Sequence, residues 1–388
     1  MLIGQQVTVL GAGVAGLAVA TALAHRGASV RVLEQAPVLG EAGGGLQISP
    51  NGAAVLRGLG LGAQLAAAGV RGQAVELRRG ADDGLVLRLD LGRLRPGQGY
   101  HFLHRADLID LLAGAARAAG VEIALAQPVE AVDLSGAQPT LRIAGAVQKA
   151  GVLIGADGLQ SQIRHALNGP AEPFFTGQVA WRAVVPCEPE AAPVASVMMG
   201  PGRHLVSYPL RASTLRNIVA VEERSAWAAE GWRLRDDPAA LRAAFAGFGG
   251  RVPGWLQRVD EVHLWGLFRH KVAARWSGSG AVILGDAAHP MLPFLAQGAN
   301  MALEDAWVLA ECLGRAGSVD QGFAAYQLHR EARVRRVVER ATANATAYHL
   351  RGPLRVAAHL GLRLAGAVVP GLALRKFDWL YGLDVTRD

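Results

Sequence analysis

The sequence predicts an α/β fold in which a parallel, helix-covered sheet is intermixed with a mostly antiparallel sheet, followed by a helical C-terminal region. Three observations predict it: a strand–helix–strand pattern fills the first 34 residues, long alternating runs fill residues 173–272, and helical periodicity dominates after residue 298. The alternating runs are 178–185, 196–210, 215–223 and 262–272, and one helical segment near 237–248 interrupts them. Residues 77–97 also alternate and are expected to form a hairpin, and a further short, buried strand is expected at residues 281–284. The two sheets are therefore expected to share the chain in interleaved segments.

The first unit is a strand, a glycine-rich turn and a helix. Directly after the apolar residues 7–10, Gly11, Gly13 and Gly16 follow in the spacing G-x-G-x-x-G, and an Ala/Leu-rich helical pattern begins. In this motif the first glycine permits the tight turn, the second lets the backbone approach a pyrophosphate, and the third lets helix and strand pack closely. The order of these features predicts a Rossmann-like domain that binds a dinucleotide.

An acidic residue completes the dinucleotide motif. A second strand, residues 29–33, leads into Glu34, where a carboxylate can accept hydrogen bonds from ribose hydroxyls. An arginine at this point would instead favour a 2′-phosphate. Glu34 therefore favours FAD or NAD over NADP as the bound dinucleotide.

Two later strands also end in a carboxylate. The buried run 151–155 is followed by Asp157, and the run 281–284 is followed by Asp286. After Asp286 come a loop stiffened by proline and the start of a helix. This arrangement can bind a cofactor that has a polar ribitol or phosphate end. We expect Asp286 to contact that end of the cofactor and Asp157 to lie on the cofactor side of its turn.

The loop after Asp286 leads into a helix that opens with Gly298, Ala299 and Asn300. The backbone N–H groups of these residues have no partner within the helix, and the helix dipole adds to their preference for negative charge. We expect them to face a flat cofactor ring that tolerates negative charge, with Pro293 shaping the loop beside it.

Length and composition bound the class of protein. The 388 residues suffice for two intermixed domains, and 51% hydrophobic with 18% charged residues fits a well-buried enzyme rather than a disordered chain. Two cysteines offer no disulfide framework or metal cluster, and no signal segment is evident, so a cytoplasmic protein without a metal is expected. The apolar stretches are too short for stable membrane insertion.

The net charge of +7 is concentrated near the C-terminus, because residues 321–388 hold 11 Arg and Lys against 5 Asp and Glu. A nucleic-acid footprint would be broader, so no nucleic-acid partner is expected. The main interpretation is a basic helix that is solvated or faces a dimer partner, in a monomer or homodimer. Attraction of an anionic substrate or reduced nicotinamide cofactor, or of a membrane surface, is an alternative.

With these motifs in place, the chain resembles the single-component FAD-dependent aromatic hydroxylases, in particular the salicylate and 6-hydroxynicotinate hydroxylases. The likeness covers almost the whole length. Three segments carry it: the Gly11–Gly16 motif with Glu34, the segment Gly155–Gly158 with Ser161 and Arg164, and the segment Gly285–Asn300. The middle segment separates these hydroxylases from amine oxidases that share only the first.

The resemblance implies functional residues beyond the motifs. Arg105, in His-Arg-Ala-Asp-Leu, matches the family arginine that reaches the FAD pyrophosphate or ribitol. Other implied FAD contacts are Ala15, Gln35, Gly45 and Val129. Tyr208 is implied as a substrate contact, and Pro293 as a residue at the oxygen-reacting face of the flavin.

The resemblance also implies the reaction. NADH or NADPH binds transiently and reduces FAD, and one atom of O2 then passes through a flavin C4a-hydroperoxide to a small phenolic or N-heteroaromatic acid. Only one G-x-G-x-x-G is present, so the nicotinamide cofactor has no second Rossmann domain of its own. Phe294 departs from the polar histidine of hydroxynicotinate hydroxylases, which leaves the substrate open, and His204, His101 and His270 remain unranked as catalytic bases.

The predicted FAD-binding domain comprises residues 1–76, 98–172 and 270–320. The substrate domain comprises 77–97 and 173–269, and residues 321–388 form the C-terminal helical region. Two other functions stay open from sequence: an FAD-dependent hydroxylase or oxidase acting on a non-aromatic or polycyclic substrate, and a redox-active or regulatory flavoprotein without substrate turnover.

Overall fold

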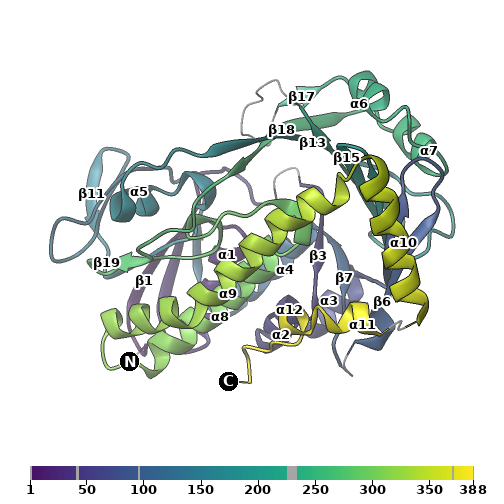
Figure 1. Ribbon diagram of the computed structural model, residues 1–388. Coiled ribbons are helices and arrows are strands. Elements are labelled where there is room, and N and C mark those ends of the chain that lie inside the picture. Colours follow the sequence, from purple (N-terminus) through teal and green to yellow (C-terminus); the bar gives the residue numbers. More distant parts are fainter. Residues whose placement is uncertain (1, 41–42, 95–96, 225–233, 369–370, 388) are drawn as a thin grey trace.

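A computed structural model describes residues 2–40, 43–94, 97–224, 234–368 and 371–387 of the chain. It contains two large sheets with helices packed on and between them, and a long helix that crosses the molecule (Figure 1). The predicted fold class is confirmed: a parallel and a mostly antiparallel sheet are interleaved along the chain, and helices dominate its C-terminal part.

The parallel sheet is assembled from distant parts of the chain. Its strand order is β19 (Ser277–Gly278), β20 (Ala281–Ile283), β12 (Val152–Gly155), β1 (Gln6–Leu10), β2 (Ser29–Leu33) and β8 (Glu122–Ala124). All neighbours pair in parallel except β19 with β20. The carboxyl ends of β1, β2, β12 and β20 therefore meet at one edge, where such sheets bind ligands.

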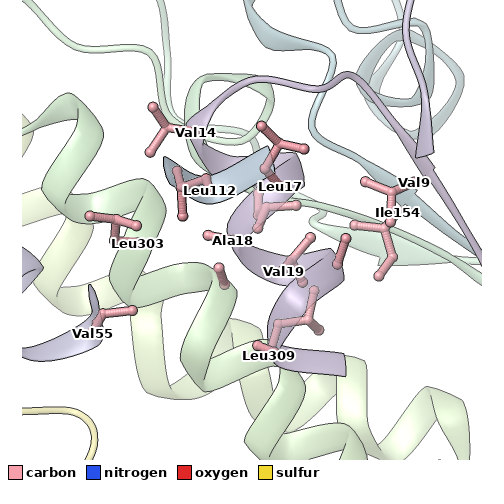
Figure 2. Close-up of a cluster of buried hydrophobic side chains, with 14 of the residues drawn as sticks. Val9, Val14, Leu17, Ala18, Val19, Val55, Leu112, Ile154, Leu303 and Leu309 are labelled. Atoms are coloured by element: carbon pink, nitrogen blue, oxygen red, sulfur yellow. The ribbon is translucent and has the colours of Figure 1, made fainter. Parts of the chain in front are cut away.

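Helices pack on this sheet, and α1 (Val14–Ala24) contacts both β1 and β2. Helix α1 is apolar on nearly all sides and packs against α4 (Arg105–Ala118) and α8 (Gly298–Arg315). Figure 2 shows the interior at this point, where side chains of α1 meet Leu112 of α4 and Leu303 and Leu309 of α8. Residues Leu17, Ala18 and Val19 are fully buried, so the turn that precedes α1 is held on a rigid base.

The second large sheet packs against the loop between β20 and α8, because Ala180 and Val221 of the sheet share a buried cluster with Leu292 and Phe294 of the loop. Its order is β17 (Arg235–Asp236), β18 (Val262–Arg269), β13 (Phe174–Pro186), β16 (Leu215–Glu223), β15 (Arg203–Leu210), β14 (Val194–Gly200), β5 (Ala74–Arg79) and β6 (Leu85–Asp90). Neighbouring strands are antiparallel except β14 with β5. The hairpin predicted near residues 77–97 therefore extends the sheet formed by the alternating runs.

Two details differ from the sequence prediction. The run Ser196–Leu210, predicted as alternating without a break, is a hairpin, because the chain turns at Pro201–Gly202 and Gly202 adopts a φ of +69°. The single helix predicted near 237–248 is α6 (Pro238–Ala244), and a second helix, α7 (Val252–Gln257), follows it. Both helices pack on the outer face of the sheet, where Trp255 and Phe245 are buried.

Smaller elements complete the fold. The remaining strands are β3 (Gly45–Ile48), β4 (Val70–Arg71), β7 (His101–His104), β9 (Val129–Asp133), β10 (Thr140–Ile143) and β11 (Ala146–Lys149). The remaining helices are α2 (Pro50–Gly58), α3 (Gly62–Ala68), α5 (Gln162–Asn168), α9 (Val319–Tyr348), α10 (Gly352–Val368), α11 (Leu372–Arg375) and α12 (Asp378–Tyr381). None of the helices in the described ranges is long and apolar enough to cross a bilayer.

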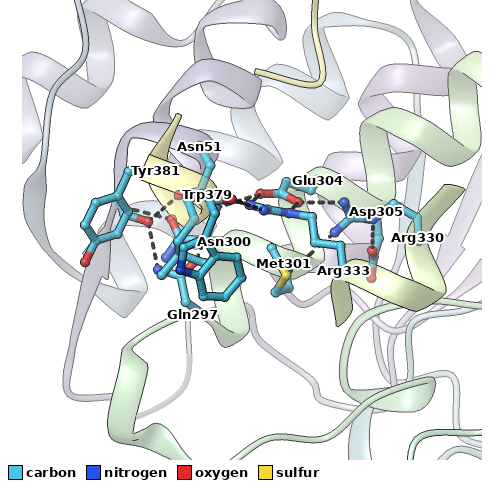
Figure 3. Close-up of polar contacts among 12 residues, drawn as sticks. Asn51, Gln297, Asn300, Met301, Glu304, Asp305, Arg330, Arg333, Trp379 and Tyr381 are labelled. Atoms are coloured by element: carbon cyan, nitrogen blue, oxygen red, sulfur yellow. Dashed lines mark hydrogen bonds and ion pairs between the residues drawn. The ribbon is translucent and has the colours of Figure 1, made fainter. Parts of the chain in front are cut away.

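A buried cluster of charges fastens α9 to α8 (Figure 3). Arg330 contacts Asp305 (Nε–Oδ1, 2.8 Å) and Glu304 (Nη1–Oε2, 2.6 Å), and Arg333 also pairs with Glu304 (2.7 Å). The side chains of Glu304 and Asp305 are fully buried. Asp305 Oδ2 also accepts a hydrogen bond from the backbone N–H of Gly285 (3.0 Å), so this cluster positions the loop after β20.

The cluster predicts acid sensitivity. Burial opposes ionisation of Asp305, but His289 and Arg330 outweigh it and lower the pKa of Asp305 to about 2. A carboxyl whose folded pKa lies below its ordinary value of 3.8 stabilises the fold at higher pH and loses that contribution as pH falls. The free energy of unfolding in urea should therefore drop from about pH 4 to pH 2. An Asp305→Asn variant with an equally steep drop would contradict this assignment.

Candidate active site

The structure brings the three predicted motifs together at the edge of the parallel sheet. Gly11 has a φ of +96°, and a Cβ on it would lie 2.6 Å from the carbonyl oxygen of Ala156. A Cβ on Gly16 would overlap the carbonyl oxygen of Gly11. Similarly, a Cβ on Gly285 would lie 3.1 Å from the Cβ of Ala15, so the turn after β1 touches both later motifs.

Gly13 differs from its two neighbours in the motif. Its φ of −79° suits any residue, and a Cβ built on it would meet no protein atom within 4 Å. The protein's own structure therefore does not require glycine at this position. A pyrophosphate that the backbone approaches closely would require it, which is the role predicted from the sequence.

Glu34 lies at the end of β2, beside the glycine turn. Its carboxylate accepts hydrogen bonds from the backbone N–H groups of Ala12 (2.7 Å) and Ala36 (2.9 Å). Gln35 next to it is exposed. Val129, the first residue of β9, is half-buried and its carbonyl accepts a hydrogen bond from Gln162. Glu34 and Gln35 follow β2 of the parallel sheet, whereas Val129 lies in the small sheet of β9, β10 and β11; the contacts of all three with a cofactor stay predictions.

Asp157 has an unused acceptor at this edge. One carboxylate oxygen, Oδ2, accepts from the N–H of Gln162 (3.0 Å), whereas Oδ1 is buried without a hydrogen-bond partner. Burial raises the pKa of Asp157. A buried acceptor without a partner is costly, so a donor from a bound ligand or water would stabilise it.

Asp286 is accessible to solvent although many protein atoms surround its carboxylate. Its side chain is exposed, yet burial among neighbouring atoms raises its pKa, while His289, Arg105 and His270 oppose that shift. His289 is in the same loop, and its Nε2 lies 2.5 Å from Asp305 Oδ2, so it helps to fix the loop to the buried cluster. Asp286 therefore presents a carboxylate on a loop that the buried cluster holds in place.

The start of α8 lies on the other side of this loop. Helix α8 begins at Gly298, so the amides of Gly298, Ala299 and Asn300 have no acceptor within the helix. The Asn300 side chain points elsewhere: its Oδ1 accepts from the N–H of Ser49 (2.9 Å), and its Nδ2 donates to the carbonyl of Gln47 (2.9 Å). Asn300 therefore joins α8 to β3 through its side chain and leaves only its backbone amide for a ligand.

The glycine segment that enters β3 brings Arg105 and Tyr208 close together. The N–H of Arg105 donates to the carbonyl of Gly44 (3.1 Å), and a Cβ on Gly43 would lie 2.9 Å from that of Arg105. A Cβ on Gly45 would lie 2.5 Å from the Tyr208 ring. Tyr208 is buried on the inner face of the antiparallel sheet, and its contact with a substrate stays a prediction.

Sequence reasoning missed two residues of this inner face. Asn217 of β16 lies opposite Tyr208 and accepts a hydrogen bond from the N–H of Gly45 (2.7 Å). Arg182 of β13 stacks over Trp265, with its guanidinium carbon 4.8 Å from the ring centroid. Burial lowers the pKa of Arg182 to about 10, with a further contribution from Arg105. An arginine that points inward from an alternating strand is the signal that could have found it.

The structure also separates the three candidate histidines. His204 lies on the inner face with Tyr208, and its ring is 5.4 Å from that of Phe294, which follows Pro293 in the loop before α8. His101 lies in β7, where burial and the nearby Arg71 and Arg57 lower its pKa to about 4. His270 follows β18 and acts on Asp286. Only His204 adjoins both the inner face and the Pro293 loop.

These residues fit FAD. Four features lie at the edge where a dinucleotide would bind. They are the open space beside Gly13, the Asp157 Oδ1 without a hydrogen-bond partner, the accessible carboxylate of Asp286 and the first-turn amides of α8. Glu34 offers a carboxylate for the ribose at the same edge. The apolar Phe294 and the inner face of the antiparallel sheet would lie on the side of the flavin ring.

Asp286→Ala should weaken FAD binding by about 1–3 kcal/mol, because it removes a charged hydrogen-bond acceptor. Fluorescence titration of the apoprotein with FAD gives the dissociation constant. Asp260→Ala, which removes an exposed carboxylate far from the site, serves as the matched control. Equal FAD affinity in both variants would contradict the role of Asp286.

Comparisons with known proteins identify the family. The family model described as an FAD binding domain matches residues 5–341. The 3-amino-4-hydroxybenzoate 2-monooxygenase of Streptomyces platensis is 36% identical over 98% of this chain and 96% of its own length. The 3-hydroxybenzoate 6-hydroxylase of Polaromonas naphthalenivorans is 34% identical over 98% and 96% of the two chains.

A solved salicylate hydroxylase substrate complex has the same fold. It superposes with a TM-score of 0.82 over 99% of this chain and 97% of that chain, at 24% sequence identity. The fold, the glycine motif, the two strand-end carboxylates and the family match point to one conclusion. The chain belongs to the FAD-binding-domain family and, within it, to the single-component FAD-dependent aromatic hydroxylases.

Proposed function

We propose that this protein hydroxylates a small phenolic or hydroxylated N-heteroaromatic acid, using NADH or NADPH and O2. Bound FAD would supply the oxidising chemistry, taking hydride from the nicotinamide and transferring one oxygen atom from O2 to the ring. The observation that carries the proposal is the inner face of the antiparallel sheet. It presents Arg182, His204 and Tyr208 beside the loops that would hold the FAD ring.

Arg182 is proposed to hold the substrate carboxylate. Burial disfavours its charged form, and Arg105 acts on it with like charge, so an anion bound next to it would relieve both effects. Asn217 on the neighbouring strand offers a buried Nδ2 without a hydrogen-bond partner. A guanidinium and an amide together suit a planar carboxylate.

His204 is proposed to accept the phenolic proton of the substrate. Removing this proton makes the ring more electron-rich and therefore more reactive toward an electrophilic oxygen. Burial and the adjacent His349 lower the pKa of His204 well below its ordinary value, so its imidazole is neutral at physiological pH and can act as a base. Tyr208 and Phe294 are proposed to enclose the aromatic ring and exclude water.

The test is oxidation of NADH and NADPH by the FAD-loaded protein with a panel of aromatic acids. The panel contains 3-amino-4-hydroxybenzoate, 3-hydroxybenzoate, salicylate and 6-hydroxynicotinate, and products are identified by mass spectrometry. Ligand-stimulated oxidation with a hydroxylated product supports the proposal. If oxidation of the nicotinamide cofactor stays slow with every panel compound and no product forms, a non-aromatic or polycyclic substrate is favoured.

Arg182→Met should raise KM for a carboxylated substrate roughly tenfold or more, since a charge-assisted hydrogen bond contributes about 1.5–3 kcal/mol. The KM for the same ring without its carboxylate should hardly change. Arg258→Met removes a half-exposed arginine on the outer side of the sheet and is the control. Equal losses for both substrates would refute the carboxylate role.

A cytoplasmic location and the choice between monomer and homodimer also remain proposals. The basic C-terminal region is predicted to be solvated or to face a dimer partner, so its charge leaves both states open. Light scattering of the FAD-loaded protein gives the molar mass directly. A single mass of one chain at every concentration would exclude the homodimer.

A further inference from the structure

A row of hydrogen-bonding side chains leads from the inner face of the antiparallel sheet to the protein surface. His204 Nδ1 lies 2.7 Å from His349 Nε2, and His349 Nδ1 lies 3.0 Å from Glu223 Oε1. His204 and His349 are only 1% and 4% exposed, whereas the Glu223 side chain is 38% exposed. The row therefore starts in the interior and ends in solvent.

The backbone holds this row in place. His204 pairs with Val221 in the β15–β16 ladder, so Glu223 lies two residues further along β16 on the same face. His349 ends α9, and its carbonyl accepts a hydrogen bond from the N–H of Gly202 (3.2 Å). Gln178 of β13 adds a contact to His349 Nδ1 at 3.5 Å. Three strands and a helix end fix the two rings relative to the carboxylate.

The surrounding charges favour a neutral pair of imidazoles beside an ionised carboxylate. Burial lowers the pKa of both histidines, and His349 lowers the pKa of His204 further. At His349, Glu223 opposes the shift, whereas Arg351 and Arg203 reinforce it. Arg351 pairs with Glu223 at 2.5 Å, and Arg351 and His349 together outweigh burial and keep the pKa of Glu223 low. The ring of Tyr348 packs on His204 and stays protonated, because burial raises its pKa to about 12.

We propose that His349 and Glu223 conduct to solvent the proton that His204 accepts from a phenolic substrate. The proposal rests on the proposed function, because it requires a phenol at His204. The phenolic O–H bond breaks and the proton binds His204 Nε2. The Nδ1 proton of His204 moves to His349 Nε2, and the Nδ1 proton of His349 moves to Glu223, which releases it to water. Reprotonation of the product at His204 Nε2 reverses each step and restores both tautomers.

The proposed proton-transfer path from His204 through His349 to Glu223, called the relay below, predicts an effect on rate that a purely structural role of these contacts does not predict. If His349 and Glu223 only fastened α9 to the sheet, a variant that kept the fold would transfer the proton at the normal rate. If they conduct the proton, loss of the carboxylate slows transfer even where folding, FAD binding and ligand affinity are unchanged. His349 and Glu223 are thus positioning and proton-transfer residues that act through His204.

The experiment measures proton release directly. FAD-loaded protein in weak buffer with phenol red is mixed rapidly with 3-amino-4-hydroxybenzoate, and separately with 3-hydroxybenzoate, without NADH or NADPH. Glu223→Gln should slow release by roughly tenfold or more, below the ~10²–10⁴-fold of a group in direct contact with the reacting atom. Added formate or imidazole should restore the rate, and Glu223→Asp should retain most of it.

Glu222→Gln is the matched control, because it changes the same charge on the adjacent residue. Glu222 pairs with Arg203 (3.2 Å) and Arg224 (3.5 Å) rather than with the histidines. Release at the wild-type rate in Glu223→Gln and in His349→Gln would overturn the relay and leave the proposed function intact. If neither ligand released a proton from the wild-type protein, the proposed deprotonation at His204 would itself be wrong, and the relay with it.

Discussion

Replacing Gly13 with valine is expected to abolish FAD binding while the protein remains folded. The backbone of Gly13 has a φ of −79° and extended ψ, which a β-branched residue adopts readily, and its Cβ would meet no protein atom within 4 Å. The valine side chain would instead fill the space into which the pyrophosphate is expected to approach. Nothing in the fold offsets that clash, so the variant should purify colourless.

The measurements are FAD titration and thermal unfolding of the apoprotein. Gly114→Val is the control, because Gly114 is an exposed glycine in α4 whose Cβ would also meet no atom within 4 Å. Both variants should unfold near the wild-type apoprotein, and only Gly13→Val should fail to bind FAD. A Gly13→Val protein that retains wild-type FAD affinity would show that the turn does not hold the pyrophosphate.

Arg330→Leu should destabilise the protein by about 3 kcal/mol or more, since removing one partner of a buried ion pair leaves uncompensated charge. Arg330 is fully buried and contacts both Glu304 and Asp305. Asp305 also braces Gly285 and His289, so FAD affinity should fall along with stability. Urea unfolding gives the free energy, and FAD titration below the unfolding midpoint gives the affinity.

Arg335→Leu is the matched control for this prediction. Arg335 lies on the same helix and pairs with Glu331, but its side chain is 49% exposed, and an exposed i,i+4 pair contributes only about 0.3–0.5 kcal/mol. Similar losses for Arg330→Leu and Arg335→Leu would refute the idea that the buried cluster holds α8, α9 and the Asp286 loop together.

The dinucleotide part of the site could be predicted from sequence because each of its signals is local. A strand, a glycine turn and a helix start are contiguous around Gly11–Gly16, and Asp157 and Asp286 lie within three residues of the ends of β12 and β20. Parallel pairing of β1, β12 and β20 then brings these motifs together, so no other long-range contact has to be predicted. The antiparallel character of residues 173–272 was equally readable, because its alternation has a period of two.

The inner face could not be assembled from sequence in the same way. Arg182, His204 and Asn217 lie on strands whose neighbours in the sheet depend on long-range pairing. The contact between His204 and His349 joins residues 145 positions apart. The turn at Pro201–Gly202 was missed because two residues barely interrupt the alternating pattern, and α7 was missed because Pro253 and Gly254 are typical of a turn.

The most direct test of the central claim is turnover under isotopically labelled dioxygen. FAD-loaded protein, NADH or NADPH and the most active aromatic acid of the panel are incubated with the labelled gas, and the product is analysed by mass spectrometry. A hydroxylase of this kind should place one labelled oxygen atom in each product molecule, with hydrogen peroxide rising only for poorly fitting ligands. Product formed in a ligand-stimulated reaction without any label would contradict the claim and identify the protein as an oxidase.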